Sequence, residues 1–131
     1  MDRPKILGQL ASSGTAKAIL YSLPVDNTGR AESSVVYTVV GSIAIISNDN
    51  NAATANVWIM RNVDTASTAA KELIAATMAI GASETIILNA GIILEGEPEY
   101  ITSGTGTSAG IVVQAATGSL TFQAFGVEVL R

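Results

Sequence analysis

The sequence predicts an all-β fold, an antiparallel β-sandwich or jelly roll, in a single domain over residues 1–131. Short runs rich in Val, Ile, Ala and Thr alternate along the chain with Gly, Ser, Asn and Asp turns. Hydrophobic residues make up 48% of the chain and aromatic residues only 5%, so its apolar content is mostly aliphatic. The last run, SLTFQAFGVEVL at 119–130, has the composition of a strand. This length suits one domain, and no linker divides it.

The first half of the chain predicts an N-terminal arm followed by strands and polar loops. The expected segments are an arm at 1–5, an apolar segment at 6–12, strands at 16–24, 34–48 and 56–62, and loops at 25–33 and 49–55. Pro24 ends the first of these strands because proline cannot donate to a ladder. The run 34–48 is apolar on both faces, which predicts either one strand buried on both sides or two segments bent at Gly41.

The second half begins with a stretch whose type the sequence leaves open. Residues 63–81 contain helix formers on one helical face, but also threonines and serines that favour strands and loops. Helix and strand are equally favoured over 66–76, whereas strand is favoured over 73–80.

The remaining segments all predict strands and turns. We expect two or three strands within 82–103 around Asn89-Ala90-Gly91 and Gly96, a flexible connection at 104–110, and a final hairpin of 111–118 and 119–130 over Thr117-Gly118. The spacing of seven to nine short strands is typical of a β-sandwich.

The charge pattern argues against nucleic acid and membrane partners. The net charge is −4, the pI is about 4.6, and no two of the seven basic residues are adjacent, whereas phosphate binding needs clustered Lys and Arg. The uncharged run Ser33–Asn48 is shorter than the roughly 20 residues that a membrane helix needs. The N-terminal segment MDRPKILGQL carries charges and a proline, so no signal peptide is expected.

The chain offers few groups for catalysis or metal binding. It has no histidine and no cysteine, which excludes a Ser–His–Asp triad, disulfides and thiolate metal sites. Glu95, Glu97 and Glu99 would share one face of a strand and form a candidate cation site, but Gly96 and Pro98 favour three solvated side chains. The glycine-rich segment 104–110 lacks the Lys-Ser/Thr of a phosphate loop. We therefore expect no enzyme activity, no cofactor and no metal.

Trp58 and Met60 are the candidate interface residues. In NVWIMRN (56–62) they alternate with Val57 and Ile59, so they face outward if those two face the core. Exposed Trp and Met on one strand face are typical of a contact surface. The alternative, that both faces of this strand are covered within one chain, is equally favoured.

The overall composition predicts a homo-oligomer, a dimer or a trimer. Charged residues make up only 14% of the chain and mean hydropathy is +0.42. Without a membrane span, the remaining place to bury apolar surface is another protein chain.

Several segments together resemble a family of small β-sandwich structural proteins of tailed bacteriophages. The segments are LGQL (7–10), AILYSLP (18–24), GSIAIISN (41–48), NVWIM (56–60), ETIILNAGIILEGE (84–97) and LTFQAFGVEVL (120–130). The loop after Pro24 and the segment 98–117 depart from the pattern.

The resemblance implies a virion structural protein, made in the host cytoplasm. Such proteins decorate capsids as cement subunits that contact the major capsid protein, or form parts of tails, baseplates and fibres. The loops of this chain, rich in Ala, Ser, Thr, Asn and Gly, favour decoration over receptor binding. A small hydrolase is a remote alternative.

Overall fold

A computed structural model describes residues 2–13, 15–23, 35–48, 50–60, 73–95 and 109–130. Every regular element in these parts is a β-strand. The strands are β1 (Asp2–Ser13), β2 (Ala18–Ser22), β3 (Val35–Ser47), β4 (Ala53–Met60), β5 (Leu73–Ile80), β6 (Thr85–Glu95), β7 (Gly110–Thr117) and β8 (Ser119–Leu130). The expected all-β class is confirmed, and the open stretch is a strand over 73–80 as favoured.

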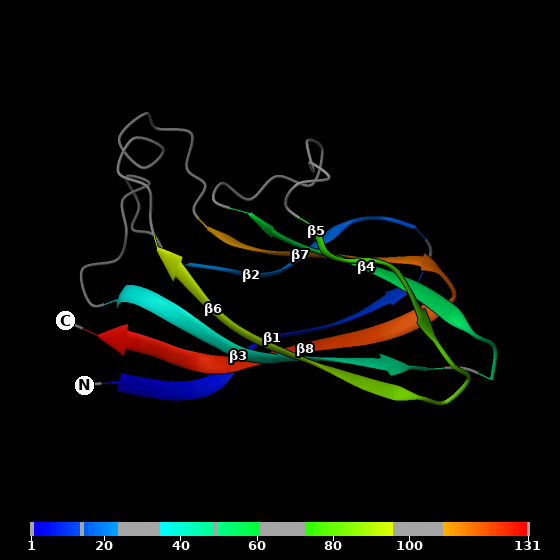
Figure 1. The fold of residues 1–131 in the computed structure, drawn as a ribbon, viewed down its shortest axis with the longest axis horizontal. Coiled ribbons are helices and arrows are strands. Elements are labelled where there is room, and N and C mark those ends of the chain that lie inside the picture. Colours follow the sequence, from blue (N-terminus) through cyan, green and yellow to red (C-terminus); the bar gives the residue numbers. More distant parts are fainter. Residues whose placement is uncertain are drawn as a thin grey trace.

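The strands form two four-stranded sheets that pack face to face (Figure 1). Sheet A has the order β1-β8-β3-β6 and sheet B the order β2-β7-β4-β5. Every pairing is antiparallel. Among the described strands, β4 is followed in the chain by its own neighbour β5, and each of the others up to β7 is followed by a strand of the opposite sheet. This strand order is the jelly roll, in which two interleaved Greek keys wrap one core.

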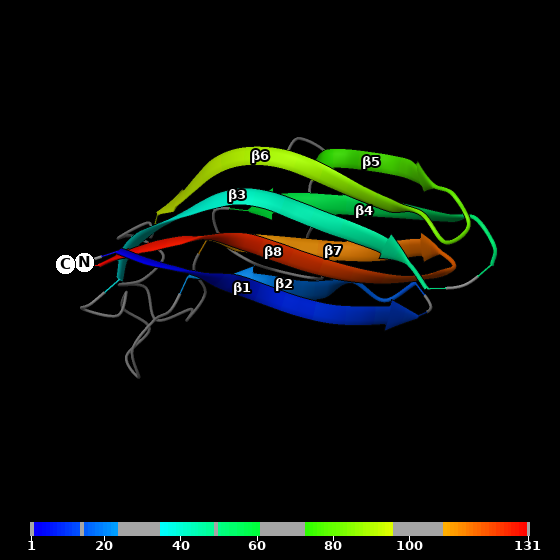
Figure 2. The ribbon, with the colours of Figure 1, turned by 90° about the horizontal axis from the view of Figure 1, so that it is seen from below.

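The two sheets lie closer to each other along one side of the sandwich than along the other. Strands β1 and β2 are in contact on one side, while β5 and β6 line the opposite side (Figure 2). The chain has glycine where β1 crosses β2, because a Cβ on Gly8 would lie 1.9 Å from the carbonyl oxygen of Leu20. Both chain ends lie at the same end of sheet A, since Asp2 pairs with Val129.

The core joins large side chains of sheet A to small side chains of sheet B. Ile43, Ile45 and Phe122 point inward from sheet A and are fully buried. Sheet B meets them with branched residues and with four buried alanines, namely Ala53, Ala55, Ala75 and Ala115. Large residues opposite small ones let the two layers interdigitate at interior density.

A β-bulge at Gly41 explains why β3 looked apolar on both faces. Val40 pairs with Gly126 and Ser42 pairs with Phe125, so Gly41 is an extra residue relative to β8. Before the bulge even-numbered residues of β3 face the core, and after it odd-numbered residues do. Both sequence-based alternatives were therefore partly right, since β3 is one continuous strand that changes register at Gly41.

The expected final hairpin is wrong. β7 belongs to sheet B and β8 to sheet A, so the chain crosses between sheets at Gly118 instead of pairing with itself. Gly118 has φ of +79°, and a Cβ there would lie 2.6 Å from the Cβ of Ala53. Turn chemistry located the reversal correctly, but it could not distinguish a hairpin from a crossing between layers.

Three further boundaries differ from expectation. Residues 2–5 are not an arm, because they pair with β8 as the first part of β1. The expected loop 49–55 ends earlier, since β4 begins at Ala53. The Asn89-Ala90-Gly91 segment does not separate two strands; it is an irregularity within the single strand β6, where pairing with β3 shifts between Val40 and Ser42.

Candidate functional site

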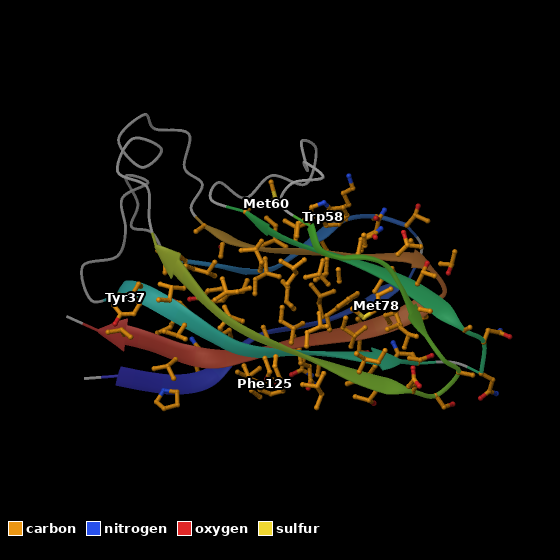
Figure 3. The ribbon with its side chains drawn as sticks, viewed as in Figure 1. Tyr37, Trp58, Met60, Met78 and Phe125 are labelled. Atoms are coloured by element: carbon orange, nitrogen blue, oxygen red, sulfur yellow. The ribbon has the colours of Figure 1, made fainter. Side chains whose placement is uncertain are left out.

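The outer face of sheet A is built from alternate residues of its four strands. Phe122 and Ala124 of β8 point into the core, so Phe125 and Val127 point away from sheet B. Figure 3 shows Phe125 on this outer side. In register with Val127 across the sheet lie Pro4 of β1, Val39 of β3 and Ile93 of β6.

The exposed part of this face is apolar. The outer patch comprises Pro4, Ile6, Val39, Ile93, Phe125 and Val127. Ile6 is 53% exposed and Ile93 58% exposed, and Ile87, farther along β6, is 60% exposed. Isolated exposed hydrophobic residues are ordinary on protein surfaces, but a continuous patch over four adjacent strands is a typical interaction surface.

The rest of the described face combines apolar side chains with hydroxyl and amide groups. Its described side chains beyond the outer patch are aliphatic or aromatic, hydroxyl or amide groups, including Ser42, Asn89, Gln9, Gln123 and Thr121. None of the described side chains on this face is ionisable except the Tyr37 phenol. The charged side chains of Lys5 and Glu128 instead pair with each other on the inner side of the sheet.

The outer face of sheet B carries the two residues expected at an interface. Trp58 and Met60 lie on the face opposite Val57, as predicted, and form a small cluster with Val112 of β7 (Figure 3). They are nevertheless only 6% and 3% exposed, so they are covered within a single chain. A contact of these residues with a second chain stays a prediction, and the exposed area they offer to one is small.

Polar contacts complete the cover of sheet B. The Lys17 Nζ lies 5.1 Å from the centre of the Trp58 ring, a cation–π contact. Two residues before Trp58 on β4, the Asn56 amide donates to Gln114 Oε1 at 2.9 Å and accepts from the Thr77 backbone N–H at 2.7 Å. The Gln114 amide donates in turn to the Thr15 carbonyl oxygen at 2.8 Å. These side chains link three strands and the segment before β2.

A separate cluster of polar side chains lies between the two sheets. Glu128 of β8 is 1% exposed; its Oε2 accepts from the Tyr21 hydroxyl at 2.8 Å, and its Oε1 lies 3.3 Å from Lys5 Nζ. Because Tyr21 gives its one proton to Glu128, the Thr38 hydroxyl at 2.9 Å donates to the Tyr21 oxygen. The cluster joins both sheets at one end of the core and satisfies a buried carboxylate.

Sequence reasoning did not identify this cluster, although a signal was present. Glu128 falls in the same alternation as the buried residues Leu120, Phe122 and Ala124 of β8. A charged residue on the inward face of a strand predicts a buried partner. The outer patch had a similar signal, because the second half of this strand places apolar Phe125, Val127 and Val129 on the face opposite the core.

The candidate cation site at Glu95, Glu97 and Glu99 lies outside the described side chains. The side chain of Glu95 and all of Glu97 and Glu99 lie outside the described residues. Within the described parts of the chain, no group of three acidic, histidine or cysteine side chains could hold a metal ion. Those same parts contain no helix of the length and hydropathy needed to cross a membrane.

Comparison with known proteins gives structural likenesses but no match in sequence. No protein-family profile and no curated protein sequence matches the chain. A chain of a solved structure described as "Structure of infectious bursal disease virus Gx strain" superposes with a TM-score of 0.49 and 13% sequence identity. The superposition covers 98% of this chain and 32% of the viral chain, so this protein spans about a third of that chain's length.

Proposed function

We propose that the protein is a structural component of a tailed-bacteriophage virion, and that it serves as a capsid decoration (cement) protein on the head surface. In this role it bridges neighbouring major capsid proteins and has no catalytic activity. The observation that carries the proposal is the outer face of sheet A, whose described side chains are mostly apolar and carry no formal charge, which suits contact with protein more than contact with solvent or an ionic ligand.

Two further features support a structural role. The segments that resemble phage virion proteins form the framework of the fold, including β2, β6 and β8. The jelly roll is an architecture used by viral capsid domains, although lectins and cupins share it and the fold alone does not assign a function.

The mechanism rests on buried apolar area. Contact of sheet A with another protein chain of the assembled shell removes isoleucine, valine and phenylalanine side chains from water, at about 25 cal/mol per Å² before the cost of association. Because the face lacks charged groups among its described side chains, the contact resists salt. A protein that binds only the assembled lattice stabilises that lattice by mass action.

The experiment is to locate the protein on purified virions and to remove its gene. Antibody labelling is expected on the head, and particles without the protein are expected to rupture at lower temperature and lower external osmolarity. Supplying the protein in trans should restore both, which is the control.

Two outcomes contradict the proposal in different ways. Labelling restricted to the tail would favour a tail, baseplate or fibre subunit. Absence of the protein from purified virions would exclude any virion role.

A further inference from the structure

We infer that the outer face of sheet A binds a second copy of this chain, forming a two-fold symmetric dimer by face-to-face packing of the two sheets. The inference deepens the proposed function and rests on it only for its setting in the virion. It names a second copy of the chain as the partner on this face, so that a dimer is the unit that contacts the capsid through its remaining surface.

The chemistry of the face favours a copy of itself. In a two-fold interface, residues near the axis meet their own copies, so an ionised group there would face a like charge. The described side chains on this face are apolar, hydroxyl or amide groups, apart from the Tyr37 phenol. Two acidic residues, Asp2 and Glu95, stand in register with Val129 and Tyr37, but they lie at the ends of the edge strands β1 and β6, away from the centre of the face. Hydroxyls and amides carry both donors and acceptors and can therefore pair with their own kind. A chain with net charge −4 can associate with itself most readily through such a surface.

The face is also large enough. Four strands about 4.8 Å apart and about ten residues of β3 at about 3.3 Å each span roughly 19 by 33 Å. That is about 600 Å² on each copy and about 1,200 Å² in total, above the roughly 1,000 Å² expected of a biological interface.

The relief of the face suits close packing. On β3, one of the two central strands, the small residues Gly41, Ser42 and Ala44 lie at and after the bulge, with Ile87 of β6 beside Ala44 on one side. On the other side Phe125 stands beside Ser42. At this part of the face the small residues of β3 lie between the larger Phe125 of β8 and Ile87 of β6, which allows two such sheets to approach at the usual spacing of about 10 Å.

The alternative surface is less suitable. On sheet B the large apolar residues Trp58, Met60 and Val112 are already buried within the chain. Ile19 of β2 is 47% exposed on that side, close in exposure to Ile93, and so provides a matched control.

The test is the association state of the full chain and of two single variants, measured by sedimentation from 1 to about 100 µM. The wild type is expected to be a dimer and Ile93→Asp a folded monomer. The dissociation constant should rise about a hundredfold, because the substitution occurs twice in the interface at about tenfold each. Ile19→Asp should leave the dimer as in the wild type. A monomeric or trimeric wild type overturns the inference, as does an equal effect of both variants.

A second measurement covers the case in which Ile93→Asp fails to fold. The chain has no cysteine, so Ser42→Cys introduces the only thiol at the centre of the face. A short bismaleimide is expected to cross-link Ser42→Cys into dimers, while Ser22→Cys on β2, an exposed position of sheet B, should remain uncross-linked. Cross-linking of Ser22→Cys alone, or of neither variant, overturns the inference.

These results separate the inference from the proposed function. A dimer in solution that occurs in no virion would exclude the function and leave the inference intact. A monomer that labels phage heads would do the reverse.

Discussion

The outer faces of the two sheets differ in what covers them. On sheet B, Trp58 and Met60 are buried within the chain, and Asn56 and Gln114 hold a line of hydrogen bonds across the strands. On sheet A, Ile6, Ile87 and Ile93 are exposed along the edge strands. The large apolar residues of β4 are thus covered within the chain, and on sheet B exposed isoleucines remain only on the described edge strands, Ile19 of β2 and Ile74 of β5. On sheet A the exposed isoleucines are instead continuous in register with the apolar residues of the central strands.

The difference shows that an apolar outward strand face is not by itself an interface signal. Tryptophan is a residue type typical of interfaces, yet Trp58 is covered by its own chain. The residues that remain exposed are plain isoleucines, which composition alone does not distinguish from core residues. Exposure after folding, more than residue type, therefore identifies the candidate surface.

The largest expected effect separates the two sides of sheet A through the chain's two phenylalanines. Phe122 is fully buried between the sheets, so Phe122→Ala should lower the free energy of unfolding by about 3–5 kcal/mol. Phe125→Ala, three residues along the same strand on the outer face, should cost less than about 1 kcal/mol at concentrations where the chain is monomeric. Denaturant unfolding at two protein concentrations provides the measurement.

The same pair of variants can also contradict the assignment of Phe125 to the outer face. A dimer makes the unfolding midpoint depend on concentration, and Phe125→Ala should reduce this dependence. Equal destabilisation by both substitutions at low concentration would mean that Phe125 belongs to the core of a single chain.

The next effect tests the cover of sheet B. Trp58→Ala should lower the free energy of unfolding by about 3 kcal/mol, because the indole is nearly fully buried and stacks beneath Lys17. Association in sedimentation should be unchanged. Weaker association with an unchanged unfolding midpoint would instead place Trp58 at a contact between subunits, as its composition predicts.

Much of the fold could be predicted from the sequence because period-2 patterns and turn residues are local. The run 119–130 and the strand over 73–80 both followed from composition. The assignment of β7 and β8 to different sheets could not, because Thr117-Gly118 permits either a hairpin or a crossing and only the packing of the two layers decides.

The candidate site was harder to predict than the fold. The Gly41 bulge reverses which residues of β3 face outward, so alternation counted from one end gives the wrong face at the other. Glu128 finds Tyr21 across the sandwich, 107 positions earlier in the chain. Pairings of this kind depend on tertiary packing, and no local pattern specifies the partner.

A smaller effect is expected from the polar group between the sheets. Tyr21→Phe removes the donor to Glu128 Oε2 and the acceptor for Thr38, and should cost about 1.5–3 kcal/mol in unfolding free energy. Tyr37→Phe on the outer side of sheet A is the matched control and should change stability by less than about 0.5 kcal/mol. If the two substitutions have equal effects, the hydroxyl of Tyr21 does not hold the sheets together.

The smallest effect concerns the hydrogen bonds across the outer face of sheet B. Asn56→Ala removes the acceptor for the Thr77 amide, at a position where β5 is irregular and Thr77 has φ of +49°. The loss should be about 1 kcal/mol, and because it acts on the pairing of an edge strand it should be local. Hydrogen exchange should accelerate at Thr77 and its neighbours in β5, while amides of β3 and β8 keep their protection. Thr54→Val, which removes a hydroxyl pair with Thr117 on the same face and leaves the Asn56 contact with Thr77 in place, is the control and should leave exchange at Thr77 unchanged. If Asn56→Ala accelerates exchange equally in both sheets, the polar line stabilises the whole sandwich, and the two outer faces differ less in their energetic roles than in their exposure.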